Sequence, residues 1–326
     1  MKKKVVVIGG GTGTFTVLSG LKKYPLDLTA IVAMSDSGGS TGILRDELGV
    51  LPPGDVARCL VALSSSDALM RALMDYRFDN GNLKGHRFGN LLLSALEKTT
   101  GSFDAAVGKA SEILRIDGRV VPVTLDKVHL VAHVGRRVIR GEERIQMTEL
   151  NGNLKSLTLE PAAQANPKAL AAIRAADLIL IGPGNFYASI VPNLLVRGVA
   201  EAIRKSKARK VFVCNLMTKA EHTRGYSVAD YTNAIEKYLG GKIDIVIYNN
   251  VKPSPSLLKR YARENDTLIA WDDLPQKRKL IGGNLLAHTD TSFRKIGTPA
   301  KEGSLVRHDS ARLAAIIAKI LCITRA

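Results

Sequence analysis

The chain has few cysteines, few aromatic residues and no long apolar run. Cys59, Cys214 and Cys322 are widely spaced and lie in no Cys-x-x-Cys or paired-histidine pattern, which predicts buried thiols in a reducing compartment and no structural zinc site. No apolar stretch approaches the length of a membrane span. The run that follows Lys2, Lys3 and Lys4 is too short for a signal peptide. We therefore expect a cytoplasmic protein without membrane insertion.

Acidic residues are scarce relative to basic ones. The 326 residues include 47 Lys and Arg against 30 Asp and Glu, a net charge of +17. The cations are scattered, and aromatic residues, at 5% of the chain, are not interleaved with them, so the stacking platforms of single-strand binding proteins are missing. This pattern favours a solvated basic surface that attracts anionic metabolites and predicts no specific nucleic-acid partner.

Apolar residues make up 45% of the chain, enough for a large core. Short apolar runs alternate with segments of helical periodicity, which predicts an α/β fold: a Rossmann-like, doubly wound, mainly parallel sheet in a single domain over 1–326. The expected strands are 5–8, 28–34, 178–181, 211–214 and 243–248, and the expected helices include 166–176, 193–206, 226–239 and 311–321, the last capped by Asp309 or Ser310. Residues 43–116 read as mostly helical, with Asp55 as a cap of 56–63. Residues 119–160 alternate with period two, which predicts a small antiparallel β insert.

The most informative junction is the apolar strand 5–8 followed by a glycine cluster, Gly-Gly-Gly-Thr-Gly-Thr at 9–14. Strand, glycine turn and helix together aim backbone N–H groups and a helix N-terminus at an anion, usually a phosphate. A tight turn without a ligand is the plain alternative. The glycines match neither the dinucleotide fingerprint nor a P-loop, because no third glycine and no lysine fall at the required positions. The interpretation that remains is a nucleotide or sugar-nucleotide diphosphate, with NAD-dependent dehydrogenation disfavoured.

Further polar loops are expected at the same edge of the sheet, beyond the carboxyl ends of the strands. Asp36, which follows the second strand, is typical of a ribose contact, with an Asx turn as the plain alternative. His86 is interpreted as a packing residue, and His129 with His133 as no metal site because a third ligand is missing. The candidate contacts are Gly9, Gly10, Gly11, Thr12, Gly13, Thr14, Asp36, Gly38, Gly39, Ser40, Asn90, Gly182, Gly184, Asn185, Asn215 and Thr218.

Seven stretches in a fixed order resemble the CofD-like superfamily, and within it the gluconeogenesis-factor (YvcK/GlmR) group, over nearly the whole chain. They are Val-Ile-Gly-Gly-Gly-Thr-Gly at 7–13, Asp-Ser-Gly-Gly-Ser-Thr-Gly-Ile-Leu-Arg-Asp-Glu-Leu-Gly at 36–49, Pro-Pro-Gly-Asp at 52–55, Gly-Asn-Leu-Leu-Leu-Ser-Ala-Leu at 89–96, Gly-Pro-Gly-Asn-Phe-Tyr-Ala-Ser-Ile-Val-Pro-Asn-Leu-Leu at 182–195, Cys-Asn-Leu-Met-Thr at 214–218 and Arg-His-Asp at 307–309.

The resemblance implies a regulator that binds UDP-sugars, notably UDP-N-acetylglucosamine, and directs carbon into cell-wall precursors and cell shape during gluconeogenic growth. It implies that Arg307 belongs to the UDP-sugar site and that the partner is an enzyme of amino-sugar synthesis. The CofD branch transfers a phospholactate unit with magnesium and aspartates, so a transferase using Asp36, with Asp46 or Asp55, to hold Mg²⁺ stays the alternative. The chain departs from the group at Ala57-Arg58-Cys59 and at Lys219, near the expected crevice. Turnover, oligomeric state and a bound NAD are left open.

Overall fold

The computed structural model describes residues 1–263, 265–271, 278–287 and 306–325. Its centre is a seven-stranded parallel sheet in the order β10-β9-β8-β7-β1-β2-β3. The strands are β1 (Lys3–Gly9), β2 (Leu26–Val32), β3 (Arg119–Pro122), β7 (Leu178–Ile181), β8 (Arg209–Val213), β9 (Ile245–Asn249) and β10 (Lys279–Gly283). The order reverses at β1, which lies between β2 and β7, and such a switch point is where open α/β sheets bind ligands.

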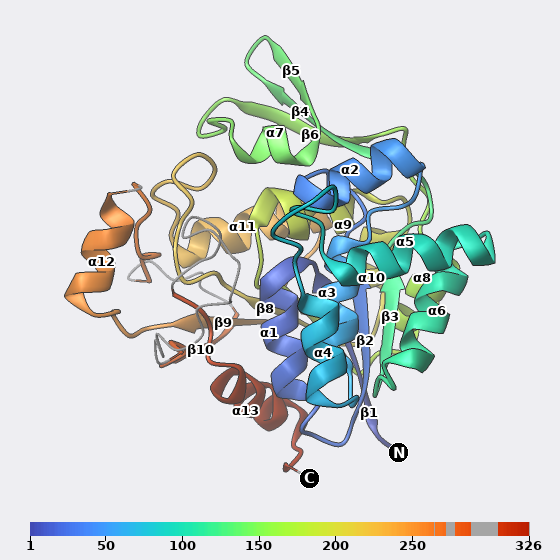
Figure 1. The fold of residues 1–326 in the computed structure, drawn as a ribbon. Coiled ribbons are helices and arrows are strands. Elements are labelled where there is room, and N and C mark those ends of the chain that lie inside the picture. Colours follow the sequence, from blue (N-terminus) through green and yellow to red (C-terminus); the bar gives the residue numbers. More distant parts are fainter. Residues whose placement is uncertain (264, 272–277, 288–305, 326) are drawn as a thin grey trace.

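Helices cover both faces of this sheet (Figure 1). On one face α1 (Gly11–Leu21) packs against α3 (Gly54–Leu63) and α13 (Ser310–Leu321), while on the other α10 (Val199–Lys205) packs against α8 (Pro167–Ala175) and α11 (Val228–Leu239). The remaining helices are α2 (Gly39–Leu48), α4 (Ala68–Asp75), α5 (Phe88–Thr100), α6 (Phe103–Ile113), α7 (Glu142–Gln146), α9 (Val191–Leu195), α12 (Pro255–Ala262) and the π-helix η1 (Phe186–Ile190). The expected doubly wound fold is confirmed.

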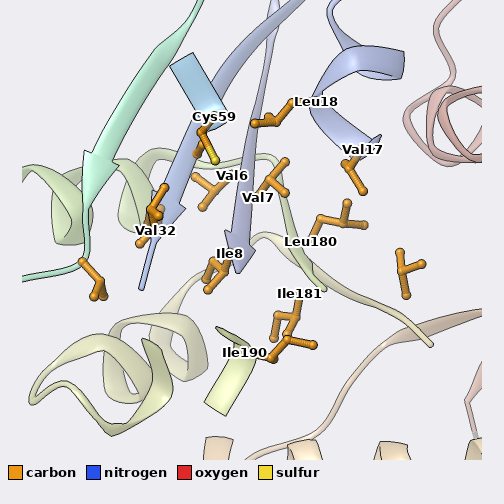
Figure 2. Packing of buried hydrophobic residues seen from close by; sticks show 14 of the residues in the cluster. Val6, Val7, Ile8, Val17, Leu18, Val32, Cys59, Leu180, Ile181 and Ile190 are labelled. Atoms are coloured by element: carbon orange, nitrogen blue, oxygen red, sulfur yellow. The ribbon is translucent and has the colours of Figure 1, made fainter. Parts of the chain in front are cut away.

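Residues 5–8 of β1 are buried on both sides, which explains their uninterrupted apolar sequence. Val6, Val7 and Ile8 are at most 2% exposed. In Figure 2, Val6 lies near Cys59, Val7 near Leu18 and Leu180, and Ile8 between Val32 and Ile181. The rigid end of this strand fixes the glycine turn that follows it.

The antiparallel insert is smaller than predicted. Its sheet contains β4 (His129–Val134), β5 (Arg137–Arg140) and β6 (Leu154–Glu160), in the order β5-β4-β6. β3 (Arg119–Pro122), which the period-two pattern assigns to the insert, instead pairs parallel with β2 at the edge of the main sheet. The antiparallel sheet therefore begins at His129, because strand partners far apart in the chain decide sheet membership.

Other local predictions are corrected by backbone geometry. The helix expected over 193–206 is broken between α9 and α10, where Gly198 has φ +92°. Asp55 does not cap α3: the residue before the helix is Pro53, and Asp55 lies in the first turn. Asp309 does cap α13, accepting hydrogen bonds from the backbone N–H groups of Ala311 and Arg312. Cys59 and Cys214 are buried as expected, whereas Cys322 is exposed.

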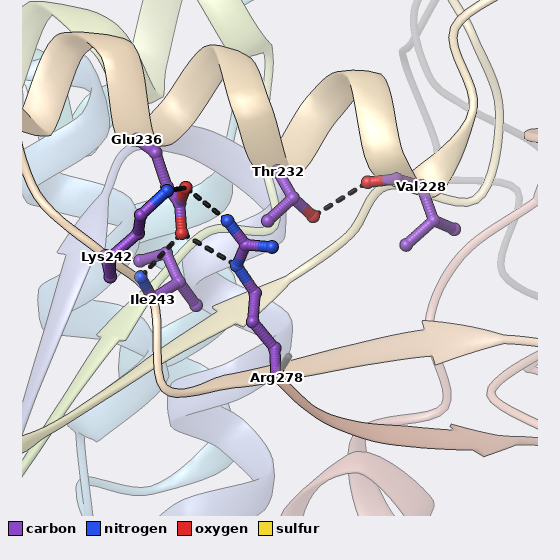
Figure 3. A network of polar contacts seen from close by, with 6 residues as sticks. All are labelled: Val228, Thr232, Glu236, Lys242, Ile243 and Arg278. Carbon is purple, nitrogen blue, oxygen red and sulfur yellow. Dashed lines mark hydrogen bonds and ion pairs between the residues drawn. The ribbon is translucent and has the colours of Figure 1, made fainter. Parts of the chain in front are cut away.

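β10 and α12 were not anticipated, and a buried ion pair fastens the start of β10 to α11. Glu236 of α11 accepts hydrogen bonds from Arg278 Nε at 2.8 Å and from the Ile243 N–H at 2.9 Å, and Lys242 lies 3.2 Å away (Figure 3). Burial opposes ionisation of Glu236, but these donors outweigh it and lower the pKa of its carboxyl. In the described part of the chain, no helix is long and apolar enough to cross a membrane.

Candidate functional site

A cavity of about 590 Å³ lies beyond the carboxyl ends of β1, β7 and β8. Three segments predicted to meet there do so: the glycine turn after β1, the turn after β7 and the turn after β8. Segments near the C-terminus complete the wall. The lining residues include Gly10, Gly11, Thr12, Gly13, Gln146, Pro183, Gly184, Asn185, Asn215, Thr218, Lys219, His222, Arg260, Asp266, Arg307 and His308.

The N-terminus of α1 opens into this cavity. Its N-cap residue is Gly10, which has no side chain, and no acidic residue lies in its first turn, although Asp55 of α3 accepts a hydrogen bond from the Gly11 N–H. The other N–H groups of the first turn have no intrahelical acceptor. Gly11 has φ +63°, a conformation that favours glycine. A Cβ on Gly13 would overlap the carbonyl group of Pro183. The glycines therefore bring the turns after β1 and β7 into contact and leave an anion-binding helix end exposed.

Two side chains predicted to contact a ligand also hold the loops together. Asn215 accepts from the Gly184 N–H at 3.2 Å and donates to the Gly184 carbonyl at 2.9 Å. Asn185 donates to Gln146 at 3.1 Å and accepts from the Ala188 N–H. These residues line the cavity, but their amides are engaged within the protein.

Thr14 and Thr218 also make hydrogen bonds within the protein. Thr218 pairs with the Thr267 hydroxyl at 3.0 Å. Thr14 is buried, and its hydroxyl faces the Gly10 carbonyl and the Cα of Gly9. Of the two threonines of the glycine turn, Thr12 alone is exposed.

The second glycine loop lies beside the cavity rather than in its lining. Asp36 accepts from the Gly38 N–H at 3.0 Å, which is the Asx turn of the plain alternative. Ser40 Oγ lies 3.1 Å from His86 Nδ1, and Asn90 Nδ2 donates to Ser40 Oγ at 3.3 Å. Ser40, His86 and Asn90 are buried, so His86 packs as predicted. Gly9, Thr14, Gly38, Gly39 and Gly182 likewise lie outside the described lining.

Two aspartates meet behind the glycine turn. Asp55 accepts a hydrogen bond from the Gly11 N–H and lies against Gly10. Burial and the neighbouring Asp36 raise the pKa of Asp55 to about 7, and burial also raises the pKa of Asp36. Glu142 of the insert is buried close by, and its pKa rises to about 8 through burial and the charge of Asp36. The sequence analysis paired Asp36 with Asp46 or Asp55 as the alternative Mg²⁺ site, but it did not foresee Glu142 beside them.

Asp36 and Asp55 could supply only part of the ligands of a magnesium ion. No group of three or more metal-binding side chains occurs among the residues the structure describes. Mg²⁺ usually binds one or two carboxylates together with ligand phosphates and water. Asp36 and Asp55 have the right chemistry to hold such an ion if a ligand supplies its phosphate oxygens.

Positive charge reaches the cavity from Lys219, Arg260 and Arg307. Lys219 donates to the Gln146 carbonyl at 2.7 Å, and burial lowers its pKa. Arg307 is exposed on a segment held by His308, whose Nε2 lies 3.2 Å from the Cys214 carbonyl. Burial lowers the pKa of His308, and likewise of His222, to about 4, so both rings are neutral at neutral pH.

The insert contributes Gln146 to the lining of the cavity, a contact that the sequence did not predict. The Leu150 N–H donates to the Glu221 carbonyl at 2.7 Å, and Asn151 donates to the Ala220 carbonyl at 2.6 Å. On its other side, the Glu143 N–H donates to Ser37 Oγ at 3.2 Å. The insert is thus hydrogen-bonded both to the loop after β2 and to the loop after β8.

Comparison with known proteins agrees with this architecture. Residues 5–286 match the model of the family described as 2-phospho-L-lactate transferase CofD. A putative gluconeogenesis factor from Thermotoga maritima is 43% identical over 97% of this chain and 99% of its own length. The gluconeogenesis factor of Bacillus subtilis is 36% identical over 98% of both chains. A crystal structure of a UPF0052-family protein from Bacillus halodurans superposes with a TM-score of 0.87, at 36% identity over 97% of this chain and 99% of that one. With its parallel sheet, its cavity at the switch point and these relatives, the chain belongs to the CofD-like family and, within it, to the gluconeogenesis factors.

Proposed function

We propose that the chain is a regulatory protein that binds a nucleoside-diphosphate sugar, UDP-N-acetylglucosamine above all, in the cavity at the end of β1. The observation that carries the proposal is the glycine-rich N-terminus of α1, whose first turn lines a space of about 590 Å³. That volume lies within the range of small-ligand sites. Helix N-termini of this kind bind phosphate groups in many proteins.

The cations around the cavity support an anionic ligand. Lys219 and Arg307 line the space, and the backbone of Gly10–Gly13 supplies its floor. The side chains of Asn185 and Asn215 are engaged in holding the loops. Recognition of the diphosphate therefore falls mainly to backbone N–H groups and to these cations.

The regulatory role rests on the name of the relatives and on the resemblance to their group. A gluconeogenesis factor that senses a UDP-sugar would act in the cytoplasm, with an enzyme of amino-sugar synthesis as its partner, and would direct carbon into cell-wall precursors. The chemistry of the cavity supports a binding role, since no nucleophile paired with a base lines it in the described part of the chain. A hydroxyl–imidazole pair close by, Ser40 with His86, is buried outside the lining.

A transferase of phosphorus-containing groups is the second candidate, and the aspartate pair favours it. Asp36 and Asp55 are the residues that would hold Mg²⁺, which would supply charge neutralisation to a transferring phosphoryl group. The family description of CofD as a transferase supports the same candidate.

Calorimetric titration tests the proposal. The protein is titrated with UDP-N-acetylglucosamine, UDP-glucose, GDP and NAD, each with and without Mg²⁺. We expect the UDP-sugars to bind more tightly than GDP and NAD. Phosphorus NMR after long incubation with Mg²⁺ then separates the two candidates, because multiple-turnover product formation would favour the transferase. Absence of UDP-sugar binding would refute the proposal.

A further inference from the structure

Arg58 stands at the one exposed threonine of the glycine turn. It lies on α3, one helical turn after Asp55, and its Nη1 donates to Thr12 Oγ1 at 2.6 Å. Thr12 lines the cavity and is exposed. The guanidinium is therefore held at the mouth of the N-terminus of α1, where the proposed function places the diphosphate.

Arg58 lies near two carboxyl groups without forming an ion pair with either. The guanidinium is close enough to Asp36 and Asp55 for its charge to favour their ionised forms. No carboxylate oxygen among the described residues lies within ion-pair distance of Arg58 itself, whereas nearby Arg87 is paired with Asp75 at 2.8 Å. Arg58 thus favours the ionised forms of Asp36 and Asp55 through space, while its Nη1 donates a hydrogen bond to the neutral hydroxyl of Thr12.

A diphosphate at the glycine turn meets an electrostatic conflict. The turn attracts the phosphate, but Asp55 lies against it with Asp36 as a neighbour, and each repels a phosphate in its ionised form. A proton on the acidic pair, a divalent cation or a fixed positive side chain can offset that repulsion, and above the Asp55 pKa of about 7 the side chain is the one that does so without Mg²⁺. Exchange of a neutral hydroxyl for a phosphate oxygen would give the guanidinium a stronger, charge-assisted hydrogen bond.

We propose that Arg58 binds the ligand's phosphate and serves as the fixed countercation of this site, so that the protein binds a nucleoside diphosphate without a divalent metal ion. The inference rests on the proposed function for the identity of the nucleotide. The interaction of Arg58 with phosphate does not depend on which nucleoside or sugar the diphosphate carries. A guanidinium suits this role because it stays charged and presents several donors to phosphate oxygens.

Calorimetry with three proteins in two buffers tests the inference. The natural protein, Arg58→Ala and Arg58→Lys are titrated with UDP-N-acetylglucosamine, and separately with pyrophosphate, in EDTA and in Mg²⁺. We expect the natural protein to bind about equally well in both buffers. Arg58→Ala should bind about 10- to 100-fold more weakly in EDTA, the range of a lost charge-assisted hydrogen bond. Mg²⁺ should restore much of that loss. Arg58→Lys should fall between the two.

Arg45→Ala is the matched control, because Arg45 also lies near enough to Asp36 to favour its ionised form but is hydrogen-bonded to Asp46 rather than to the glycine turn. Its affinity should change less than about threefold, with no rescue by Mg²⁺. Thermal melts without ligand identify any variant that is misfolded.

Three results would overturn the inference. The first is that the natural protein needs Mg²⁺ to bind the ligand, and the second is that Arg58→Ala binds pyrophosphate normally in EDTA. The third is that Arg58→Ala loses the same affinity in both buffers, which would make Arg58 a purely structural residue. Binding of pyrophosphate but not of UDP-sugars would refute the proposed function while leaving Arg58 as the countercation. Binding of neither ligand refutes both.

Discussion

Replacement of Arg307 by alanine should weaken UDP-sugar binding while leaving the unliganded protein almost as stable as before. Arg307 is exposed and lines the cavity, whereas the adjacent His308 is buried and holds the segment to the Cys214 carbonyl. A charge-assisted hydrogen bond to a phosphate contributes about 1.5–3 kcal/mol, which corresponds to a loss of roughly 10- to 150-fold in affinity. Substitution of an exposed side chain typically changes stability by less than about 0.5 kcal/mol.

Titration calorimetry and a ligand-free thermal melt measure both quantities. A change of 0.5 kcal/mol corresponds to a shift of less than about 2 °C in a protein of this size. Arg312→Ala is the control, because Arg312 lies on α13 one turn further on and outside the cavity lining. Unchanged affinity of Arg307→Ala would remove this residue from the binding site. A fall of many degrees in the melt would show that Arg307 supports the fold instead.

Three further substitutions probe the site and its frame. Gly13→Ala should lower stability by about 3 kcal/mol, the upper range for overpacking, because the added methyl group would overlap the Pro183 carbonyl; a normal melt would contradict the close contact. Asp36→Asn should tighten UDP-sugar binding in EDTA a few-fold by removing a repelling charge, and calorimetry that finds clear weakening would place this side chain in contact with the ligand. Arg278→Ala should cost about 3 kcal/mol at pH 7 by leaving the buried carboxylate of Glu236 without its main partner. Since the pKa of Glu236 is lowered in the folded protein, that stabilisation exists above its unfolded pKa and is lost as pH falls through the folded value, so chemical denaturation should show the deficit shrinking below about pH 4.5. A deficit that is constant with pH would refute the assignment.

The central strands could be predicted because they are buried on both faces. β1 and β7 present uninterrupted apolar runs, and a glycine follows each of them. β10 escaped prediction because it is an edge strand that ends in Gly282 and Gly283 and buries little. β3 was seen but assigned to the wrong sheet, since its four residues carry no mark of the distant strand with which they pair.

The site was predictable at the level of backbone and not at the level of side chains. The turns after β1, β7 and β8 do converge on one cavity, as parallel topology requires. Asn215 turned out to bind Gly184, which lies 31 positions earlier in the chain. A sequence shows which side chains have hydrogen-bonding groups, but a partner so distant is visible only after the loops are packed together. The proximity of the Arg58 charge to Asp55 and Asp36 likewise depends on how the loops pack, so the sequence alone could not show its effect on these carboxyl groups.

The hydrogen bonds that hold the insert have a mechanical consequence for the pocket. The backbone of α7 and the turn after it are bonded to the loop after β8, and Glu143 is bonded to the loop after β2. Gln146 brings the inner end of the insert into the lining of the cavity, and the hairpin of β4 and β5 lies at its outer end (Figure 1). We therefore predict that a molecule bound to the hairpin changes the affinity of the pocket for its ligand, and that the ligand in turn changes hydrogen exchange in the insert. Exchange of the Leu150 amide hydrogen, which is bonded to the Glu221 carbonyl across this junction, would measure that coupling.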